Sequence, residues 1–136
     1  MPSSTTSSDR VRVLVVDDNQ AILARATAVL SPRCTVIGTA TDGATAIEAA
    51  RDLRPDVIVL DISMPGMTGL EVAYELRKAR SEAALVFLTV HNEAELIEAA
   101  RAAGGIGYVL KARLASDLMT AVQEARSGRP FISSTH

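Results

Sequence analysis

Two stretches of the sequence decide the fold: VRVLVVDDN at residues 11–19 and DVIVLD at residues 56–61. Each contains a short apolar run, rich in valine, that ends in carboxylates. Continuous apolar runs without alternation are typical of strands that are covered on both faces of a parallel sheet. Ligands of open α/β sheets bind outside the carboxyl ends of the strands, so both stretches place acidic side chains where a site is expected.

The rest of the chain repeats this rhythm of a short strand followed by a longer, alanine-rich helix. We expect strands at residues 11–16, 35–38, 56–60, 85–89 and 107–110, and helices at 18–30, 43–53, 70–80, 93–103 and 114–127. Apolar residues recur in the helical stretches at a spacing that places them on one face. In the third helix we expect burial of Leu70, Ala73, Tyr74 and Leu76. Five βα units predict an α/β fold, a five-stranded parallel sheet with helices on both faces.

This pattern implies a simple domain organisation. Residues 10–130 contain all the expected strands and helices and are expected to form one domain. Residues 1–9 are rich in serine and threonine and have no apolar core, so we expect a disordered leader and not a signal peptide. Residues 131–136 are expected to begin a linker or tail.

The composition excludes several classes of protein. The chain has 136 residues, of which 48% are hydrophobic and 22% charged, with a net charge of −2 and a pI near 5.6. A nucleic-acid-binding domain usually carries a basic surface, and base stacking needs aromatic residues, which make up 3% here. A single cysteine excludes an internal disulfide. No apolar run approaches the roughly 20 residues that span a bilayer, so we expect a cytoplasmic protein.

Polar side chains stand at the ends of four of the expected strands. These are Asp17 and Asp18 after the first strand, Asp61 after the third, Thr89 at the end of the fourth and Lys111 after the fifth. With a strand order of 2-1-3-4-5, the first and third strands are neighbours and these groups converge on one pocket. Close carboxylates repel one another, and a hard cation such as Mg²⁺ relieves this repulsion. A carboxylate beside Mg²⁺ can attack phosphorus, while a lysine and a hydroxyl neutralise the transferring phosphoryl group.

Each of these residues also has an ordinary structural interpretation. Asp18 can cap the first helix, and Asp61 can be a loop residue before a turn. Thr89 can be a β-branched strand residue, and Lys111 can be a solvated charge. A purely structural origin would nevertheless have to place all of these groups at strand ends by accident. We therefore interpret them together as a site for phosphoryl chemistry.

The segments that carry these residues resemble the receiver domain of two-component response regulators. The matching segments are VRVLVVDDN at 11–19, PDVIVLDISMPGMTGLEV at 55–72, VFLTVHNE at 86–93 and GYVLKA at 107–112. The resemblance covers residues 10–130 and implies the flavodoxin-like receiver fold with strand order 2-1-3-4-5. LDISMPGMTGLE together with GYVLK is most similar to the subfamily that carries a LuxR-type helix-turn-helix output.

The resemblance implies a role for each pocket residue. Asp61 matches the phosphoacceptor and a metal ligand. Asp17 and Asp18 match the acidic pair that positions Mg²⁺, and the backbone carbonyl of Ser63 matches a further protein ligand of the ion. Lys111 matches the lysine that pairs with the phosphoryl group. The expected cofactor is therefore Mg²⁺.

The resemblance also implies a conformational switch. Thr89 matches the hydroxyl that turns toward the phosphoryl group, and Tyr108 matches the aromatic residue that moves inward with it. Phosphorylation is expected to change a surface formed by the fourth helix, fifth strand and fifth helix. That surface includes Leu96, Ile97, Tyr108 and Leu118. A homodimer is expected through this surface or through the first and fifth helices.

The expected function is therefore that of a signalling switch and not of a metabolic enzyme. Its chemistry is limited to its own phosphorylation and dephosphorylation at Asp61. The resemblance implies a phosphohistidine of a sensor histidine kinase as the donor, for which acetyl phosphate can substitute. No direct contact with nucleic acid or membrane is expected.

The sequence departs from the family pattern in three places. Ala112 follows Lys111, where many members of the family have a proline. Val90 follows Thr89, where the family usually has a small residue, and its branched side chain could narrow access to Asp61. The chain ends where the linker to an output domain would begin, so a DNA-binding domain is expected to be absent from it. An excised receiver and a stand-alone receiver are both compatible with this end.

Three other functions compete with this interpretation. A pseudo-receiver would keep the fold as a binding module without phosphorylation. An aspartyl-phosphate phosphatase would need a general acid two residues after Asp61, where this chain has Ser63. A flavin-binding protein would need a phosphate-binding loop where Asp17 and Asp18 would repel phosphate.

Overall fold

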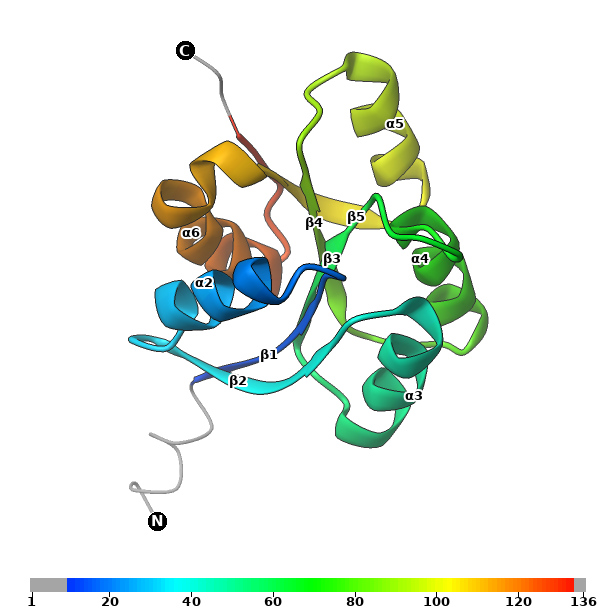
Figure 1. Cartoon of the computed structure of the whole chain (residues 1–136), viewed down its shortest axis with the longest axis horizontal. Coiled ribbons are helices and arrows are strands. Elements are labelled where there is room, and N and C mark those ends of the chain that lie inside the picture. Colours follow the sequence, from blue (N-terminus) through cyan, green and yellow to red (C-terminus); the bar gives the residue numbers. More distant parts are fainter. Residues whose placement is uncertain (1–9, 134–136) are drawn as a thin grey trace.

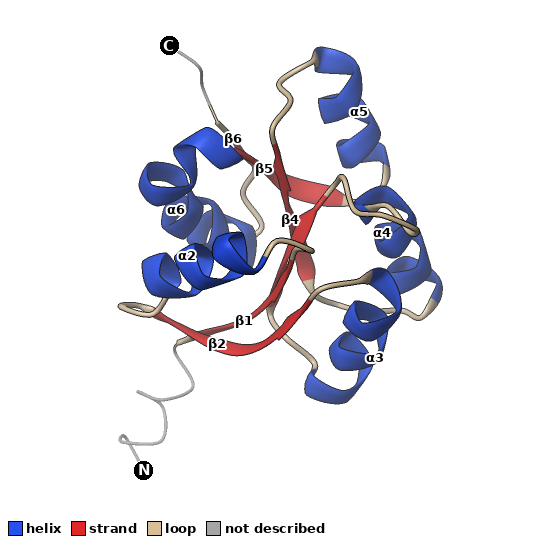
Figure 2. Cartoon of the chain, viewed as in Figure 1, coloured by secondary structure: helices blue, strands red, loops and turns tan. Residues whose placement is uncertain are grey.

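The computed structural model describes residues 10–133 and has three layers, with one parallel sheet between two layers of helices (Figure 1). The strands are β1 (Val11–Val16), β2 (Cys34–Ala40), β3 (Val57–Asp61), β4 (Ala84–Thr89), β5 (Gly105–Leu110) and β6 (Phe131–Ile132). Their order is β2-β1-β3-β4-β5-β6, and every neighbouring pair is parallel (Figure 2). The predicted α/β fold and its 2-1-3-4-5 order are thus confirmed.

The helices alternate with the strands as expected. They are α2 (Gln20–Leu30), α3 (Gly43–Leu53), α4 (Gly69–Lys78), α5 (Ala94–Ala102) and α6 (Leu114–Arg126), with a short 3-10 helix, η1 (Lys111–Arg113), before α6. Within the part of the chain that the structure describes, no helix has the length and apolar character needed to cross a membrane. The leader expected at residues 1–9 lies outside the described residues.

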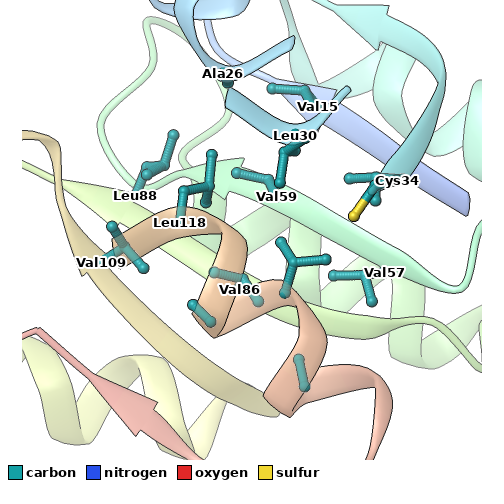
Figure 3. Close-up of a cluster of buried hydrophobic side chains, with 14 of the residues drawn as sticks. Val15, Ala26, Leu30, Cys34, Val57, Val59, Val86, Leu88, Val109 and Leu118 are labelled. Carbon is teal, nitrogen blue, oxygen red and sulfur yellow. The ribbon is translucent and has the colours of Figure 1, made fainter. Parts of the chain in front are cut away.

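Two apolar cores, one on each face of the sheet, hold the three layers together. Helices α2 and α6 cover one face, and α3, α4 and α5 cover the other (Figure 1). Because successive side chains of a strand point to opposite faces, Val15 of β1 joins the first core and Val16 joins the second. Figure 3 shows the first core, where Leu30 of α2 and Leu118 of α6 pack over the central strands. The sheet is covered on both faces, which accounts for its continuous apolar strands.

The turn after β1 differs from expectation, because α2 begins at Gln20 and not at Asp18. The side chain of Asn19 accepts hydrogen bonds from the backbone N–H groups of Ala21 and Ile22, at 2.8 and 3.2 Å. This cap satisfies N–H groups that the first helical turn leaves without partners. Asn19 therefore caps α2, and Asp18 lies exposed in the turn.

The last strand, β6, is absent from the sequence-based prediction. Phe131 and Ile132 pair in parallel with Gly107 and Tyr108 of β5. The sheet thus continues beyond residue 130, into the segment expected to begin a linker or tail. A strand of two residues is too short to show the hydrophobic period by which strands are recognised in a sequence.

The exposure of Tyr74 differs from expectation, and two residues expected on the partner surface, Tyr108 and Leu118, are buried. Tyr74 is 60% exposed, with the ammonium of Lys78 located 5.5 Å from the centre of its ring. The buried face of α4 consists instead of Gly69, Val72, Ala73 and Leu76. Leu118 is fully buried and Tyr108 is 3% exposed, so neither contributes to a partner surface in this conformation. Adjacent residues of a helix point in different directions, so Tyr74 does not share the buried face with Ala73.

Candidate functional site

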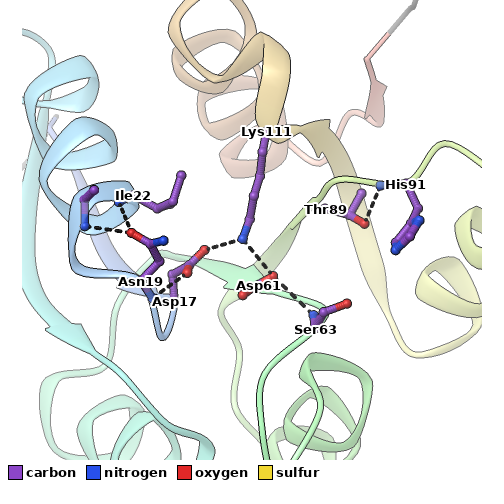
Figure 4. A network of polar contacts seen from close by, with 9 residues as sticks. Asp17, Asn19, Ile22, Asp61, Ser63, Thr89, His91 and Lys111 are labelled. Carbon is purple, nitrogen blue, oxygen red and sulfur yellow. Dashed lines mark hydrogen bonds and ion pairs between the residues drawn. The ribbon is translucent and has the colours of Figure 1, made fainter.

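The carboxyl ends of β1, β3 and β5 bring Asp17, Asp61 and Lys111 together (Figure 4). Asp17 follows β1 and is fully buried, and Asp61 is the last residue of β3 and is 1% exposed. Lys111 follows β5, and its Nζ lies 3.0 Å from Asp17 Oδ2 and 3.3 Å from Asp61 Oδ1. One ammonium group therefore faces two buried carboxylates, which come from strands that neighbour each other in the sheet.

The oxygens of the two carboxylates are not equally satisfied. The backbone N–H of Asn19 donates to Asp17 Oδ1 at 2.9 Å, and that of Ser63 donates to Asp61 Oδ1 at 3.2 Å. Asp17 Oδ2 meets Lys111 as an ion pair but receives no directed hydrogen bond from the described residues. Asp61 Oδ2 is buried and has no hydrogen-bond partner within residues 10–133. Leaving a buried carboxylate oxygen in this state costs free energy, so the atom marks a position for a ligand.

The charges of the pocket are perturbed by this arrangement. Burial and the neighbouring charge of Asp17 raise the pKa of Asp61 to about 6, although Lys111 and the N–H of Ser63 act in the opposite direction. Burial alone would lower the pKa of Lys111, but its interactions with Asp17 and Asp61 outweigh this effect and raise that pKa. Lys111 is therefore protonated at neutral pH. Perturbed titratable groups gathered in one pocket are typical of functional sites.

Asp18 completes a group of carboxylates that could hold a metal ion. One oxygen each from Asp17, Asp18 and Asp61 lie within 4.8 Å of one another, and the exposed Asp18 stands on the solvent side. Mg²⁺ prefers oxygen ligands and retains several waters, so it suits a group that is partly open to solvent. Asp17 Oδ2, a buried oxygen that accepts no hydrogen bond from the described residues, also fits a cation ligand. The predicted carboxylates are thus brought together, whereas the metal-ligand role of the Ser63 carbonyl stays a prediction.

Thr89 and Tyr108 contact the loop after β4. Thr89 is the last residue of β4, and its buried hydroxyl oxygen accepts a hydrogen bond from the N–H of His91 at 3.0 Å. The hydroxyl of Tyr108 donates to the carbonyl oxygen of His91, also at 3.0 Å. Burial raises the pKa of Tyr108, which keeps its hydroxyl a neutral donor. The two side chains expected to form the switch are therefore joined through the backbone of His91.

The loop between β3 and α4 lies against Asp61 because residue 69 is a glycine. The N–H of Gly69 donates to the carbonyl oxygen of Ile62 at 2.8 Å. A Cβ at this position would collide with the backbone of Asp61 and Ile62. Thr68 and Glu71 form a capping box that starts α4 at the same point. The absence of a side chain at Gly69 thus allows the close approach that fixes the backbone of Asp61.

A third buried carboxylate, Asp117 of α6, was missed by sequence reasoning. Asp117 is 8% exposed and accepts a hydrogen bond from Arg113 Nε at 2.9 Å. It also accepts hydrogen bonds from the hydroxyl groups of Ser116 and Ser133, at 3.1 and 2.8 Å. The spacing of four between Arg113 and Asp117 is a signal for a helical ion pair. The contact with Ser133 has no local signal, because it joins α6 to the segment after β6.

Comparisons with curated proteins identify relatives along nearly the whole chain. Residues 13–123 match the family described as the response regulator receiver domain. The chain is 34% identical over 130 residues to the nitrate/nitrite response regulator protein NarL of Escherichia coli strain K12. It is 32% identical over 126 residues to the transcriptional regulatory protein LiaR of Bacillus subtilis strain 168. These matches cover 94% and 91% of this chain, which spans 60% of the length of each relative.

Solved structures agree with these matches. The signal receiver domain of a response regulator named NarL from Mycobacterium tuberculosis has a TM-score of 0.84 and 33% identity, over 88% of this chain and 98% of that one. A two-component response regulator of the LuxR family from Aurantimonas sp. SI85-9A1 has a TM-score of 0.83 and 28% identity, over 91% and 90% of the two chains. The match over residues 13–123 agrees with the fold and with the acidic pocket and its lysine. The chain therefore belongs to the response regulator receiver domain family and is similar to its LuxR-type members.

Proposed function

We propose that this chain is a phosphorylation-activated signalling switch that accepts a phosphoryl group on Asp61 from a sensor histidine kinase. The observation that carries the proposal is the state of Asp61 Oδ2, a buried carboxylate oxygen with no hydrogen-bond partner among the described residues. Hydrogen bonds accepted by this oxygen would stabilise its negative charge and so weaken its attack on phosphorus. Asp61 Oδ2 accepts no hydrogen bond from the described residues, and the other oxygen of Asp61, Oδ1, lies 3.3 Å from Lys111 Nζ.

In the proposed reaction, Asp61 Oδ2 attacks the phosphorus atom of a phosphohistidine. A phosphorus–oxygen bond forms while the phosphorus–nitrogen bond breaks, and the imidazole nitrogen keeps the electron pair of the broken bond. The attacking carboxylate must be ionised, and with a pKa of about 6 most of Asp61 is ionised at neutral pH. Lys111 is placed to stabilise the negative charge of the phosphoryl oxygens, as such transfers require.

The carboxylates Asp17, Asp18 and Asp61 would hold Mg²⁺, with the backbone carbonyl of Ser63 as a further ligand. When bound, the ion neutralises charge on the transferring phosphoryl group. The support for this assignment is electrostatic. Two buried carboxylates that share the single ammonium of Lys111 keep an excess of negative charge, and a divalent cation offsets that excess. Asp17 is held in place for this role by the N–H of Asn19.

We further propose that Thr89 and Tyr108 report the state of Asp61 to the surface. Both hydroxyl groups bond to the backbone of His91, so a Thr89 hydroxyl that turned to a phosphoryl group would release one of the bonds that hold this loop. The loop leads into α5, where Leu96 and Ile97 are only partly buried. The face of α5, β5 and α6 is therefore a candidate partner or dimer surface, and the α2–α6 face is a second candidate.

Intact mass spectrometry after incubation with acetyl phosphate tests the proposed function. We expect the mass of one phosphoryl group to be added in the presence of Mg²⁺, little to be added in EDTA, and none to be added to Asp61→Asn. Asp56→Asn is the matched control, because Asp56 directly precedes β3, at the end opposite Asp61, and accepts a hydrogen bond from the backbone N–H of Arg12. This control should take up the group normally.

The same assay separates the proposal from the pseudo-receiver interpretation. Val90 is 67% exposed, so its side chain is not packed into the pocket interior. If neither the natural chain nor Val90→Ala gains mass, phosphorylation of Asp61 is wrong and a binding module without phosphorylation is favoured. Turnover of a phosphate ester would instead indicate a phosphatase.

A further inference from the structure

After α6 the chain returns to the sheet at the strand that leads to Lys111. Strand β6 pairs with β5, and Ser133 follows directly. The backbone N–H of Ser133 donates to the carbonyl oxygen of Tyr108 at 2.9 Å. Its hydroxyl oxygen accepts a hydrogen bond from the N–H of Leu110 at 3.1 Å. Ser133 is therefore attached to β5 at two points, one of them immediately before Lys111.

The hydroxyl of Ser133 is itself held by Asp117. It donates to Asp117 Oδ2 at 2.8 Å, and Arg113 Nε donates to the same oxygen at 2.9 Å. The pKa of Asp117 is lowered by Arg113 and further by the hydroxyl groups of Ser133 and Ser116, so the carboxylate is ionised at neutral pH. The ionised carboxylate accepts the hydroxyl proton, which leaves a lone pair of the Ser133 oxygen directed at the N–H of Leu110.

These hydrogen bonds join the two ends of the segment that contains η1. The chain runs from Leu110 through Lys111 and η1 to Asp117 in α6, and Ser133 connects Asp117 back to Leu110. Lys111 is the first residue of the bridged segment. Its side chain is long and flexible, so the position of its ammonium depends on where its backbone is held. The bridge is thus placed to hold that backbone.

We propose that Ser133, held by Asp117, is a positioning residue for Lys111. It fixes the backbone from which Lys111 reaches Asp17 and Asp61. The coupling is reciprocal, so displacement of the segment after β6 loosens Lys111, and displacement of Lys111 loosens that segment. The consequence for phosphoryl transfer rests on the proposed function, whereas the positioning of Lys111 can be measured without it.

The test uses three substitutions in the full chain. Ser133→Ala removes the hydroxyl but keeps the backbone N–H that bonds to Tyr108, so the pairing of β6 is retained. Ser133→Thr keeps a hydroxyl and is the conservative variant. Ser116→Ala is the matched control, because it removes a hydroxyl from Asp117 Oδ1, which also accepts a hydrogen bond from Arg113 Nη2. The other hydrogen bond of the Ser116 hydroxyl goes to the carbonyl oxygen of Arg113 and not to β5.

The first measurement is the NMR signal of the lysine side chains. The lysines of this chain are Lys78 and Lys111, so lysine-selective ¹³C labelling gives a Cε signal for the pocket and a reference from the exposed Lys78. We expect Ser133→Ala to move the Lys111 signal toward that of Lys78. Ser133→Thr and Ser116→Ala should leave it in place. A Lys111 signal that is unchanged in folded Ser133→Ala would overturn the proposal.

The second measurement is the initial rate of phosphorylation by acetyl phosphate at saturating Mg²⁺, below the thermal transition of every variant. Displacement of a charge-stabilising group by a fraction of an ångström predicts a loss on the order of tenfold in Ser133→Ala. Ser133→Thr should restore the rate. An unchanged rate in Ser133→Ala would overturn a role in transfer. If the natural chain takes up no phosphoryl group, the proposed function fails and the NMR measurement alone decides the positioning of Lys111.

Discussion

Asp61 and Asp117 are both buried carboxylates beside a cation, but their surroundings differ. Asp61 has one oxygen that receives no hydrogen bond from any described residue, and its pKa is raised to about 6 by burial and by Asp17. Both oxygens of Asp117 accept hydrogen bonds, and its pKa is lowered, chiefly by Arg113. The first carboxylate is destabilised by its neighbours and the second is stabilised by them.

This difference separates a carboxylate placed to react from one that holds structure. A satisfied carboxylate gains nothing from a new ligand, because its hydrogen bonds are already made. A buried carboxylate with an open oxygen and too little positive charge gains from a cation or from bond formation. Asp61 thus keeps an oxygen without a hydrogen bond from the described residues, whereas both oxygens of Asp117 accept hydrogen bonds.

The largest effect on stability is expected from removing the pocket cation. Lys111→Met leaves Asp17 and Asp61 buried together without a positive partner, which should lower the free energy of unfolding by about 3 kcal/mol in metal-free buffer. Mg²⁺ should restore part of this loss, because it supplies the missing positive charge. Urea unfolding with EDTA and with Mg²⁺ measures both effects.

The matching substitution at the second carboxylate is Arg113→Met. The side chain of Arg113 is 41% exposed, and Asp117 keeps its bonds to Ser116 and Ser133. The loss of stability should therefore be about 1 kcal/mol or less. Equal losses for Lys111→Met and Arg113→Met would show that the two carboxylates do not differ as described.

The second prediction concerns the sign of the pH dependence at Asp61. Because its pKa is raised from 3.8 to about 6 on folding, Asp61 contributes stability that is present below pH 3.8 and is lost as the pH rises through about 6. Asparagine cannot ionise and avoids this loss. Asp61→Asn should therefore raise the free energy of unfolding at pH 7 by on the order of 2 kcal/mol in EDTA. Unfolding curves at several pH values should show the gain disappearing near pH 4, and a destabilised variant at pH 7 would contradict the prediction.

At Asp117 we expect the opposite dependence of stability on pH. Its lowered pKa means that its contribution to stability is present above 3.8 and is lost as the pH falls through its folded-state pKa. Asp117→Asn should cost about 1 kcal/mol at pH 7, because a neutral amide accepts hydrogen bonds less strongly than a carboxylate. The same unfolding series, extended to acid, should show this difference shrinking. If Asp117→Asn were more stable than the natural chain at pH 7, the two carboxylates would not differ in the way described.

The smallest effect is expected at the rim of the pocket. Val90 follows Thr89 and is largely exposed, so its substitution changes few contacts. Val90→Ala should speed autodephosphorylation by about twofold, because a smaller side chain widens the path of water to Asp61 and exposed substitutions change energies by about 0.5 kcal/mol. The decay of the phosphorylated mass with time measures this rate. An unchanged lifetime would refute a steric role for Val90.

The sheet and the pocket carboxylates were predictable from the sequence for local reasons. β1 and β3 are continuous apolar runs, and Asp17 and Asp61 stand at their carboxyl ends. In a parallel sheet these ends meet at one edge, so position along the chain is enough to place both residues in one pocket. The resemblance to receiver domains then implied their roles and that of Lys111.

The directions of side chains and their hydrogen-bond partners were harder to predict from the sequence. Leu118 is fully buried, as the apolar spacing of its helix indicates, whereas Tyr74, which has a similar spacing, is 60% exposed. The start of α2 at Gln20 depended on which of two adjacent polar residues, Asp18 or Asn19, caps the helix. The exposure of Tyr74 depends on how α4 packs against elements distant in the sequence, which outweighs local preference. The start of α2 depends instead on the local hydrogen bonds that Asn19 accepts from Ala21 and Ile22.

By itself, then, the amino-acid sequence determined the alternation of strands and helices, the parallel sheet and the carboxylates at its edge, because these depend on periodicity and chain order. Only the tertiary structure decided that Asp61 keeps an oxygen without a hydrogen bond while Asp117 is fully bonded. It also decided that β6 returns to β5 and places Ser133 beside Leu110. Hydrogen bonds of this kind join segments far apart in the chain, so they exist only once packing has brought those segments together.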